Sequence, residues 1–412
     1  MVDILAASQQ SKAVSRADTG LRTLTLISVA HWVSHFHMLV LPMLFPFLKA
    51  VLGVDYIELG FALTVFAVVS ALTQAPTGYL VDHFGARKIL LSGLCLGGLA
   101  LILLGLQLNY TMLVASAVLL GLANSVYHPA DYAILAAHMN EAKMGRAFSI
   151  HTFAGYFGGA VAPAIVAALL TWVGGMGALI VSGAIGILVA LLLMLFCVPE
   201  ASAKHHAGAD GKAPKQSVIT PALIVLTIFF MLLGLSSAGI SNFGVVALMN
   251  GYGFAYAIAN VALTAYFGAA AAGVLAGGFL ADHTKRHGQV AAVCFGINTA
   301  IVLVIALVAL PAALLMIAMT AAGFLGGVIA PSRDMLVRNA APAGAAGRAF
   351  GIVSTGFNFS GMLSPLLFGW IMDQNLPHWV FGLSALFMVL TVLLTPFTER
   401  KPDETVVQAK SA

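Results

Sequence analysis

Two short stretches of the sequence, HWVSHFH and NSVYHPAD, combine side chains that could move protons or bind a polar solute. The side chains concerned are His31, His35 and His37 in the first stretch and Asn124, His128 and Asp131 in the second. Imidazole titrates near neutral pH, so a histidine can take up and release protons under physiological conditions. A carboxylate beside it can share such a proton, and an amide can hydrogen-bond a solute.

The spacing of these residues predicts which of them meet. On a helix, His31 and His35 share one face because they lie one turn apart, and so do Asn124, His128 and Asp131. The remaining histidine of the first stretch is turned by about 200° and faces elsewhere. The two sets lie about 14 and 16 Å from the inner ends of apolar runs, at about 1.5 Å per residue. We therefore expect them to meet within the membrane, where ionisable groups by default line a functional cavity.

Several roles are open to these histidines. They can carry protons that couple transport to a gradient, which we favour because of their titration range, or they can hydrogen-bond the solute without proton movement. A transition-metal site built from His31, His35, His128 and Asp131 has suitable ligands, but the HxxxH spacing alone is common. A purely structural role is the remaining interpretation, and we expect no resident metal.

The elements that hold these residues must be membrane-spanning helices. Of the 412 residues, 60% are hydrophobic and 8% are charged, whereas soluble domains have about 45–50% and about 25%. Apolar runs of about 20 residues, enough to cross about 30 Å of hydrocarbon, recur along the whole chain. The composition predicts an all-α integral membrane protein and argues against a soluble enzyme or a nucleic-acid-binding protein.

The apolar runs predict twelve transmembrane helices in two pseudo-symmetric six-helix bundles. The expected spans are 22–50, 57–80, 88–106, 111–138, 146–171, 175–198, 219–249, 254–281, 288–309, 312–338, 347–372 and 378–397. The expected parts are a cytoplasmic N-terminal tail over 1–21, a bundle over 22–198, a cytoplasmic linker over 199–217, a bundle over 218–398 and a cytoplasmic tail over 399–412.

The positions of Lys and Arg predict the orientation of the chain. With both termini in the cytoplasm, all of the 19 Lys and Arg residues except Lys49 and Arg333 fall on the inner side. Lys49 ends the first span at the outer surface, where its long side chain can reach the headgroups. We expect a multi-pass monomer in the lipid bilayer of the inner (cytoplasmic) membrane.

An internal repeat relates the two expected bundles. Gly78–Asp82 recurs 200 residues later as Gly278–Asp282, and Gly145–Phe148 recurs at an offset of 202 as Gly347–Phe350. Each half has an even number of spans, so the two halves have the same orientation in the membrane. Such halves typically enclose a central site and rock about it.

The repeat also pairs two charges that topology does not explain. At the offset of 202, Asp131 corresponds to Arg333, so the two residues belong to matching helices. We expect them to face one cavity, where they pair with each other or where Arg333 binds an anionic group of the solute. The adjacent Asp334 should point elsewhere, and Asn358 is a secondary polar candidate for binding.

The loop from Gly78 to Lys88 resembles the signature loop of the major facilitator superfamily, G-x-L-x-D-x-x-G-R-[RK], with Ala86 as an additional residue. With the span count, the linker and the duplication, this resemblance covers the whole chain. In the family, arginines and helix ends hold the acid of this loop, and this latch favours the outward-facing state. We also expect Gly78 to allow close contact between helices. The residues that would form the gate are Gly78, Asp82, Arg87 and Arg146 in the first half and Asp282, Arg286 and Arg348 in the second. The alternative is that these charges only set the topology.

Further residues resemble one branch of that superfamily. The H-[FW]-V pattern of the first span, followed by Pro42 and Pro46 and later by His128-Pro129, is similar to the fosmidomycin-resistance branch, which exports a phosphonate antibiotic. Ser34 and His35 stand where that branch usually has a polar or acidic pair, so the substrate does not transfer.

The fifth expected span carries a second, partial resemblance. Its stretch from Gly155 to Pro163 is similar to the G-x-x-x-G-P signature of drug/proton antiporters, except that Ala162 replaces the last glycine. Generic close packing of helices is the alternative role of these small residues.

The sequence therefore predicts a secondary active transporter, and not an enzyme, that moves a small organic solute by alternating access. We favour proton coupling and efflux, with the solute and protons as partners and no cofactor. Uptake of an anionic metabolite is the first alternative, and uptake of a transition metal is the second. A membrane sensor without transport belongs to another class, and the longest polar segment, the linker over 199–217, is short for a signalling domain.

Overall fold

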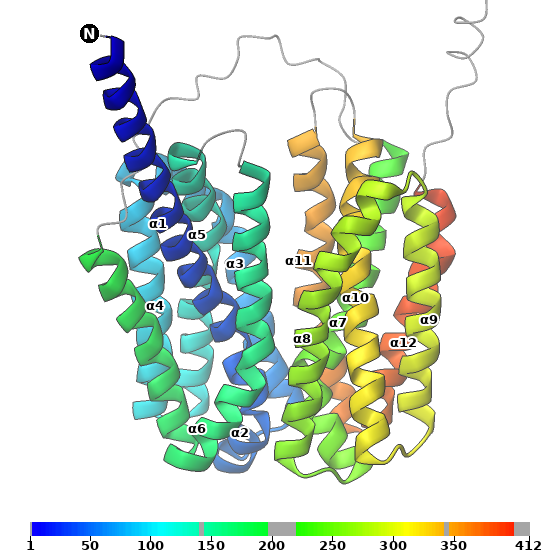
Figure 1. The fold of residues 1–412 in the computed structure, drawn as a ribbon. Coiled ribbons are helices and arrows are strands. Elements are labelled where there is room, and N and C mark those ends of the chain that lie inside the picture. Colours follow the sequence, from blue (N-terminus) through cyan, green and yellow to red (C-terminus); the bar gives the residue numbers. More distant parts are fainter. Residues whose placement is uncertain (1, 140–143, 197–219, 342–345, 399–412) are drawn as a thin grey trace, which may run out of the picture. The chain divides into compact units, whose positions relative to one another are not determined.

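The computed structural model describes residues 2–139, 144–196, 220–341 and 346–398, and these residues are helical apart from short turns (Figure 1). The helices are α1 (Val2–Met43), α2 (Phe45–Leu52), α3 (Tyr56–Phe84), α4 (Ala86–Leu106), α5 (Tyr110–His138), α6 (Met144–Leu195), α7 (Pro221–Tyr252), α8 (Tyr256–His283), α9 (His287–Leu307), α10 (Ala312–Ala340), α11 (Ala346–Asp373), α12 (His378–Leu394) and the 3-10 turn η2 (Thr395–Phe397).

Ten helices of the described residues are long and apolar enough to cross a membrane. Side chains that face away from the helix contacts are often large and apolar; Leu72, Trp172 and Leu307 are 70%, 79% and 81% exposed. Such a surface is poorly suited to water and well suited to lipid. The expectation of an all-α membrane protein is therefore confirmed.

The longest of these helices, α6, contains a reversal of the chain. Its apolar stretch Arg146–Leu195 has 50 residues, about twice the length that one crossing needs. At Gly174 the backbone has φ 74° and ψ 175°, which is not helical. Positive φ is accessible to glycine because it lacks a Cβ. The ribbon of α6 accordingly consists of two arms (Figure 1).

The first expected span, 22–50, differs from the observed helices at both ends. Helix α1 starts at Val2, so the segment expected as a tail over 1–21 continues the helix of the span. At the other end α1 stops at Met43 and α2 starts at Phe45, with the Leu44 amide donating to Val40 and Leu41 oxygens. The residue after Phe45 is a proline, which has no N–H to continue the ladder, and this explains the break.

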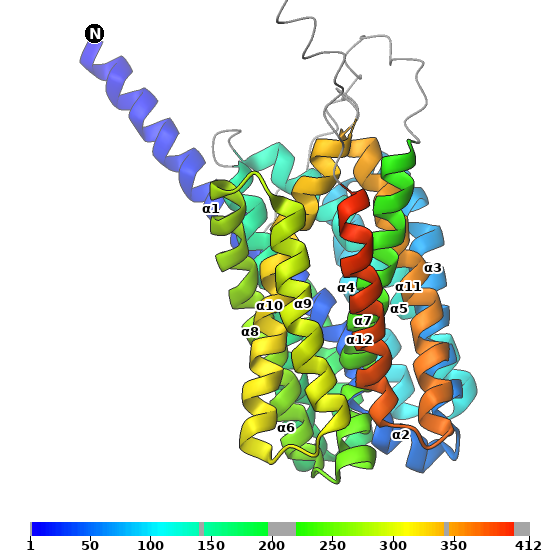
Figure 2. The same cartoon turned by 90° about the vertical axis from the view of Figure 1, so that its right-hand side faces the viewer.

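The described chain divides into two compact units. Unit 1 comprises Met1–Gly211 and Ala255–Phe267, and unit 2 comprises Lys212–Phe254 and Gly268–Ala412. In unit 1, α6 packs on α1 and α4, and α5 packs on α3 and α4. In unit 2, α7 packs on α11 and α12, and α9 packs on α10 and α12 (Figure 2). Since α6 has two arms, one packing face is available to α1 and another to α4.

An apolar core surrounds the polar stretches of unit 1. Its buried side chains come from α1, α3, α4, α5 and α6 and include Ile27, Val33, Leu90, Ile134 and Val189. Polar atoms placed in such a core lose contact with water, so any that lack a protein partner are costly. The histidines and Asp131 of unit 1 therefore lie among apolar side chains, where a missing hydrogen-bond partner is costly.

Candidate functional site

The histidines of α1 take two different positions. His31 and His35 lie on one face, as their spacing predicts, with ring centroids 4.8 Å apart. His31 is 3% exposed, whereas His35 is half-buried. His37 is also buried, but its Nε2 lies 2.9 Å from the Ser182 carbonyl oxygen of α6, so this nitrogen donates and the ring is anchored elsewhere, as expected.

Helix α5 brings Asp131 to the buried histidine of α1. Asp131 is fully buried, and its Oδ2 lies 3.6 Å from His31 Nδ1. His128, one turn earlier on α5, is exposed, and its ring centroid lies 5.3 Å from that of His31. The structure thus joins the two polar stretches of the sequence at His31, as their depths in the membrane predict.

A fourth histidine completes the cluster and was missed by the sequence analysis. His151 of α6 is fully buried, its Nε2 lies 3.5 Å from Asp131 Oδ2, and its ring stacks on His31 at 4.0 Å. It lies only five residues after Arg146, which made it resemble an interfacial residue. The signal that could have found it is its place one turn before Gly155, on the glycine face of the span. We call His31, His35, His128, Asp131 and His151 the histidine cluster.

Glycines of α6 make the space that the cluster occupies. A Cβ at Gly155 would lie 2.6 Å from His31 Nε2 and 2.8 Å from His35 Cδ2. A Cβ at Gly158 would lie 2.2 Å from the backbone oxygen of Trp32, so α1 and α6 touch backbone to backbone there. The small residues of this span therefore allow close packing against α1, which is compatible with both of the roles expected for them.

The innermost atoms of the cluster have no hydrogen-bond partner among the described residues. These atoms are His31 Nδ1, both carboxylate oxygens of Asp131 and both ring nitrogens of His151. The distances of 3.5 and 3.6 Å to Asp131 exceed those of hydrogen bonds. Burial without a partner costs free energy, so the arrangement is suited to a proton or a cation that these atoms can share.

The exposure of the cluster changes from one end to the other. His128 is exposed, His35 is half-buried, and His31, Asp131 and His151 are buried. The rings of His35, His128 and His151 each lie 4.0–5.3 Å from the ring of His31 between centroids. The cluster therefore connects a surface of unit 1 to a carboxylate in its core.

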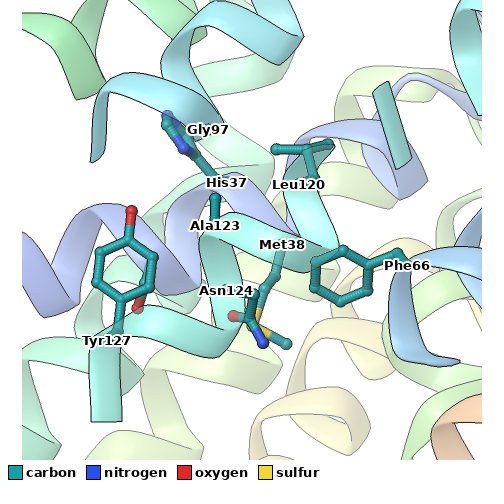
Figure 3. Close-up of a pocket in the computed structure, with 9 residues that line it drawn as sticks. His37, Met38, Phe66, Gly97, Leu120, Ala123, Asn124 and Tyr127 are labelled. Carbon is teal, nitrogen blue, oxygen red and sulfur yellow. The ribbon is translucent and has the colours of Figure 1, made fainter. Parts of the chain in front are cut away.

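Asn124 belongs to a neighbouring cavity and not to the cluster itself. Its Nδ2 donates to Ser70 Oγ of α3 at 2.8 Å. The cavity is small and is shown in Figure 3. Its lining consists of Ser34, His37, Met38, Phe66, Gly97, Leu120, Ala123, Asn124 and Tyr127. The predicted face of Asn124, His128 and Asp131 is thus divided between two places.

In unit 2, Arg333 is held by aromatic rings and by its neighbour in sequence. Its guanidinium carbon lies 5.0 Å from the ring centre of Phe230 on α7 and 5.2 Å from that of Phe357 on α11. Its Nε donates to Asp334 Oδ1 at 2.8 Å. The expectation that Asp334 points elsewhere is wrong, because its side chain turns back along α10 to the guanidinium. Asn358 is half-buried on α11, next to Phe357.

The expected gate residues of the first half lie at helix ends. Asp82 is exposed in the last turn of α3, and Gly85 separates α3 from α4 with φ 95°. Arg87 Nη2 donates to the Met194 oxygen of α6 at 3.4 Å. The close helix contact expected at Gly78 is not found, since a Cβ there would meet no described atom within 4 Å. Arg146 is exposed near the start of α6.

The corresponding residues of the second half are only partly described. Arg286 occupies the N-cap position of α9, and its backbone amide donates to Thr284 Oγ1 at 3.1 Å. The side chains of Asp282 and Arg348 lie outside the described part of the chain.

Comparisons with known proteins agree with this architecture. The chain is 27% identical over 283 residues to the fosmidomycin resistance protein of Escherichia coli (strain K12), covering 66% of this chain and 68% of that protein. It is 29% identical to the "Probable L-galactonate transporter" of the same strain over 140 residues, which cover 31% of that protein. It is 30% identical to the "Probable sulfoacetate transporter SauU" of Cupriavidus necator over 152 residues, which cover 35% of that protein.

Solved structures show the same fold at low sequence identity. A bacterial homologue of the human lysosomal transporter Spinster aligns with a TM-score of 0.77 at 15% identity, over 91% of this chain and 96% of that one. The nucleoside transporter NupG, solved as a point mutant, aligns with a TM-score of 0.74 at 14% identity, over 93% of this chain and 100% of that one.

The family itself follows from a match along nearly the whole chain. The model of the Major Facilitator Superfamily matches residues 27–259 and 227–412. Its members and the relatives above are transporters and not enzymes. This chain, with its all-helical membrane fold, therefore belongs to the Major Facilitator Superfamily of transporters.

Proposed function

We propose that this protein is a proton-coupled secondary transporter that exports a small organic solute by alternating access. The observation that carries the proposal is the histidine cluster, in which two imidazoles flank one buried carboxylate at 3.5 and 3.6 Å. Imidazoles titrate near neutral pH, and ionisable groups at membrane depth are typical of proton relays. The series from exposed His128 to buried Asp131 offers protons a route into the core of unit 1.

The fold that we propose has twelve spans in two six-helix bundles, over 22–198 and 218–398. Splitting α6 at Gly174 gives two arms that can each cross a bilayer, and α11 with 28 residues is long enough to cross as well. The packing pairs support the repeat: α1 with α6 corresponds to α7 with α11, and α4 with α5 corresponds to α9 with α10. We place the linker over 199–217 and both termini in the cytoplasm, and the monomer in the inner membrane.

Asp131 can be tested in proteoliposomes under an imposed pH gradient. The first probes are fosmidomycin, L-galactonate and sulfoacetate, the compounds that appear in the names of the relatives. We expect Asp131→Asn to reduce gradient-driven movement at least about tenfold while counterflow exchange continues, because the binding site persists without its titrating acid. The matched control is His37→Gln, which alters a buried histidine of α1 outside the cluster.

Two outcomes separate the parts of this proposal. Gradient-driven movement that survives in both Asp131→Asn and His128→Gln would refute the assignment of proton coupling. Export is supported by the relative whose name denotes resistance to fosmidomycin, and it would be refuted by net uptake under the physiological gradient.

Uptake of an anionic metabolite is a second candidate that Arg333 favours. Two relatives are named for the anions L-galactonate and sulfoacetate. A guanidinium binds carboxylate or sulfonate with two parallel hydrogen bonds, which an ammonium cannot do. We expect Arg333→Lys to raise the KM for an anionic probe about tenfold, because lysine loses one or two charged hydrogen bonds to the probe. Thermal stability should change little. A stronger response to cationic probes than to anions would exclude this candidate.

The loop charges complete the proposed mechanism. We propose that Asp82, Arg87 and Arg146 in the first half, and Asp282, Arg286 and Arg348 in the second, form a cytoplasmic gate. Their positions at or near the ends of α3, α4, α6, α8, α9 and α11 support this role, since such charges can pair across helix ends. Gly78 remains a part of the loop motif without a packing role in the described residues.

A further inference from the structure

We propose that His31, Asp131 and His151 bind one divalent transition-metal ion, for which Zn²⁺ is the representative. One potential ligand atom from each residue lies within 4.8 Å of the other two. Asp131 Oδ2 is 3.6 Å from His31 Nδ1 and 3.5 Å from His151 Nε2. Zinc bonds of about 2.0–2.2 Å place the ligand atoms of a tetrahedral site about 3.3–3.6 Å apart. The two separations from the carboxylate thus match edges of such a tetrahedron, and the stacked rings of His31 and His151 must turn for both nitrogens to point at one ion.

The same atoms make no hydrogen bond with the described residues. The atoms without a hydrogen-bond partner there are both oxygens of Asp131, both ring nitrogens of His151 and Nδ1 of His31. The three residues are 3% exposed or less. A buried carboxylate without a donor is costly, and a divalent ion would compensate that cost directly.

The ligand set selects the kind of metal. Two imidazole nitrogens and one carboxylate oxygen suit zinc, cobalt and nickel, whereas magnesium and calcium prefer oxygen ligands. Three protein ligands leave a fourth position for water or a further group, as in many zinc sites. His35 lies beside the site, with its ring centroid 4.8 Å from that of His31.

The scaffold holds the three ligands from three directions. His31, Asp131 and His151 come from α1, α5 and α6, so the site depends on the packing of three helices. The set differs from the one that the sequence suggests, His31 and Asp131 with His35 and His128, because His128 is exposed and His151 is buried against the carboxylate. The inference rests on this geometry and does not depend on proton coupling.

Metal binding can be measured on the full chain in detergent micelles, purified without a histidine tag. Titration with Zn²⁺ gives affinity and stoichiometry, and Co²⁺ reports four-coordinate nitrogen and oxygen ligation through its visible absorption. We expect one saturable site in the wild type. Loss of a ligand in His151→Gln or His31→Gln should weaken it at least about tenfold.

His37→Gln is the matched control, since it removes a buried histidine of α1 that is bound to Ser182 and lies outside the site. Exposed histidines such as His83 and His283 contribute weak sites equally in all variants. Asp131→Asn provides a third ligand variant if one histidine variant does not fold. Unchanged Zn²⁺ affinity in the folded ligand variants, or equal loss in His37→Gln, would overturn the site. Neither result would affect the transport measurements with the pH gradient.

Discussion

At the scale of single residues, the chemistry of unit 1 depends on which histidine reaches Asp131. His31 and His37 lie on the same helix and are both buried, yet one faces the carboxylate and the other donates to a backbone oxygen. His151 lies on another helix and approaches the same carboxylate oxygen as His31. Two imidazoles from different helices therefore face one carboxylate oxygen.

His151→Gln tests whether the ring on α6 takes part in coupling. Glutamine keeps hydrogen-bonding groups of similar reach but does not titrate near neutral pH. We expect gradient-driven transport to fall about tenfold or more with counterflow retained, measured in the same proteoliposomes as Asp131→Asn. His37→Gln should behave like the wild type. Equal gradient-driven transport by His151→Gln and the wild type would show that His151 takes no part in coupling, which would then involve only cluster residues of α1 and α5.

At the scale of elements, one face of α6 determines how closely α1 and α6 approach each other at the histidine cluster. His151, Gly155, Gly158 and Ala162 follow one another at three- and four-residue steps, so they share the face towards α1. Glycine at the two middle positions lets the helices touch, and the rings of His31 and His35 occupy the space beside Gly155. Packing and chemistry therefore depend on the same face.

Gly158→Ala should destabilise the protein by forcing α1 away from α6. The added Cβ would lie 2.2 Å from the Trp32 oxygen, which belongs to backbone and cannot rotate aside. Overpacking of this kind costs about 1–3 kcal/mol, and we expect a lower midpoint in thermal unfolding. Gly159→Ala is the control, because its Cβ would lie at an ordinary 3.6 Å from Leu39 Cδ1. Equal midpoints for the two variants would contradict the close crossing.

At the scale of the whole molecule, the two units carry different chemistry on related helices. The buried acid of α5 has its sequence counterpart in Arg333 of α10. Unit 1 surrounds its acid with histidines, whereas unit 2 holds its arginine with Phe230, Phe357 and Asp334. The repeated position therefore carries an acid in unit 1 and an arginine in unit 2.

The proposed topology can be tested by labelling single cysteines with a membrane-impermeant maleimide. In a variant without Cys95, Cys197 and Cys294, we expect Ser202→Cys, in the linker, to react only in inside-out vesicles. Gln107→Cys, between α4 and α5, should react only from the outside of intact cells, since an odd number of crossings separates it from the N-terminus. Reaction of both positions from one side would rule out the proposed count of spans.

The histidine of the first span, the acid of the fourth and the repeat could be predicted because each depends on local spacing or on similarity within the chain. Depth in a helix is proportional to residue number, so the meeting of His31 and Asp131 was predictable. His151 was not, because the approach of α6 to α1 depends on a long-range contact between glycine backbones. The turn of Asp334 back to Arg333 was missed because rotamers depend on the neighbouring rings.

The sequence by itself therefore determined that this chain is a helical membrane protein of two related halves, since hydrophobic length and charge position are properties of the chain alone. Tertiary structure alone decided which polar atoms meet without partners in the core. Helices packed at Gly155 and Gly158 bring His151 to Asp131, and no spacing along one helix encodes a contact between two.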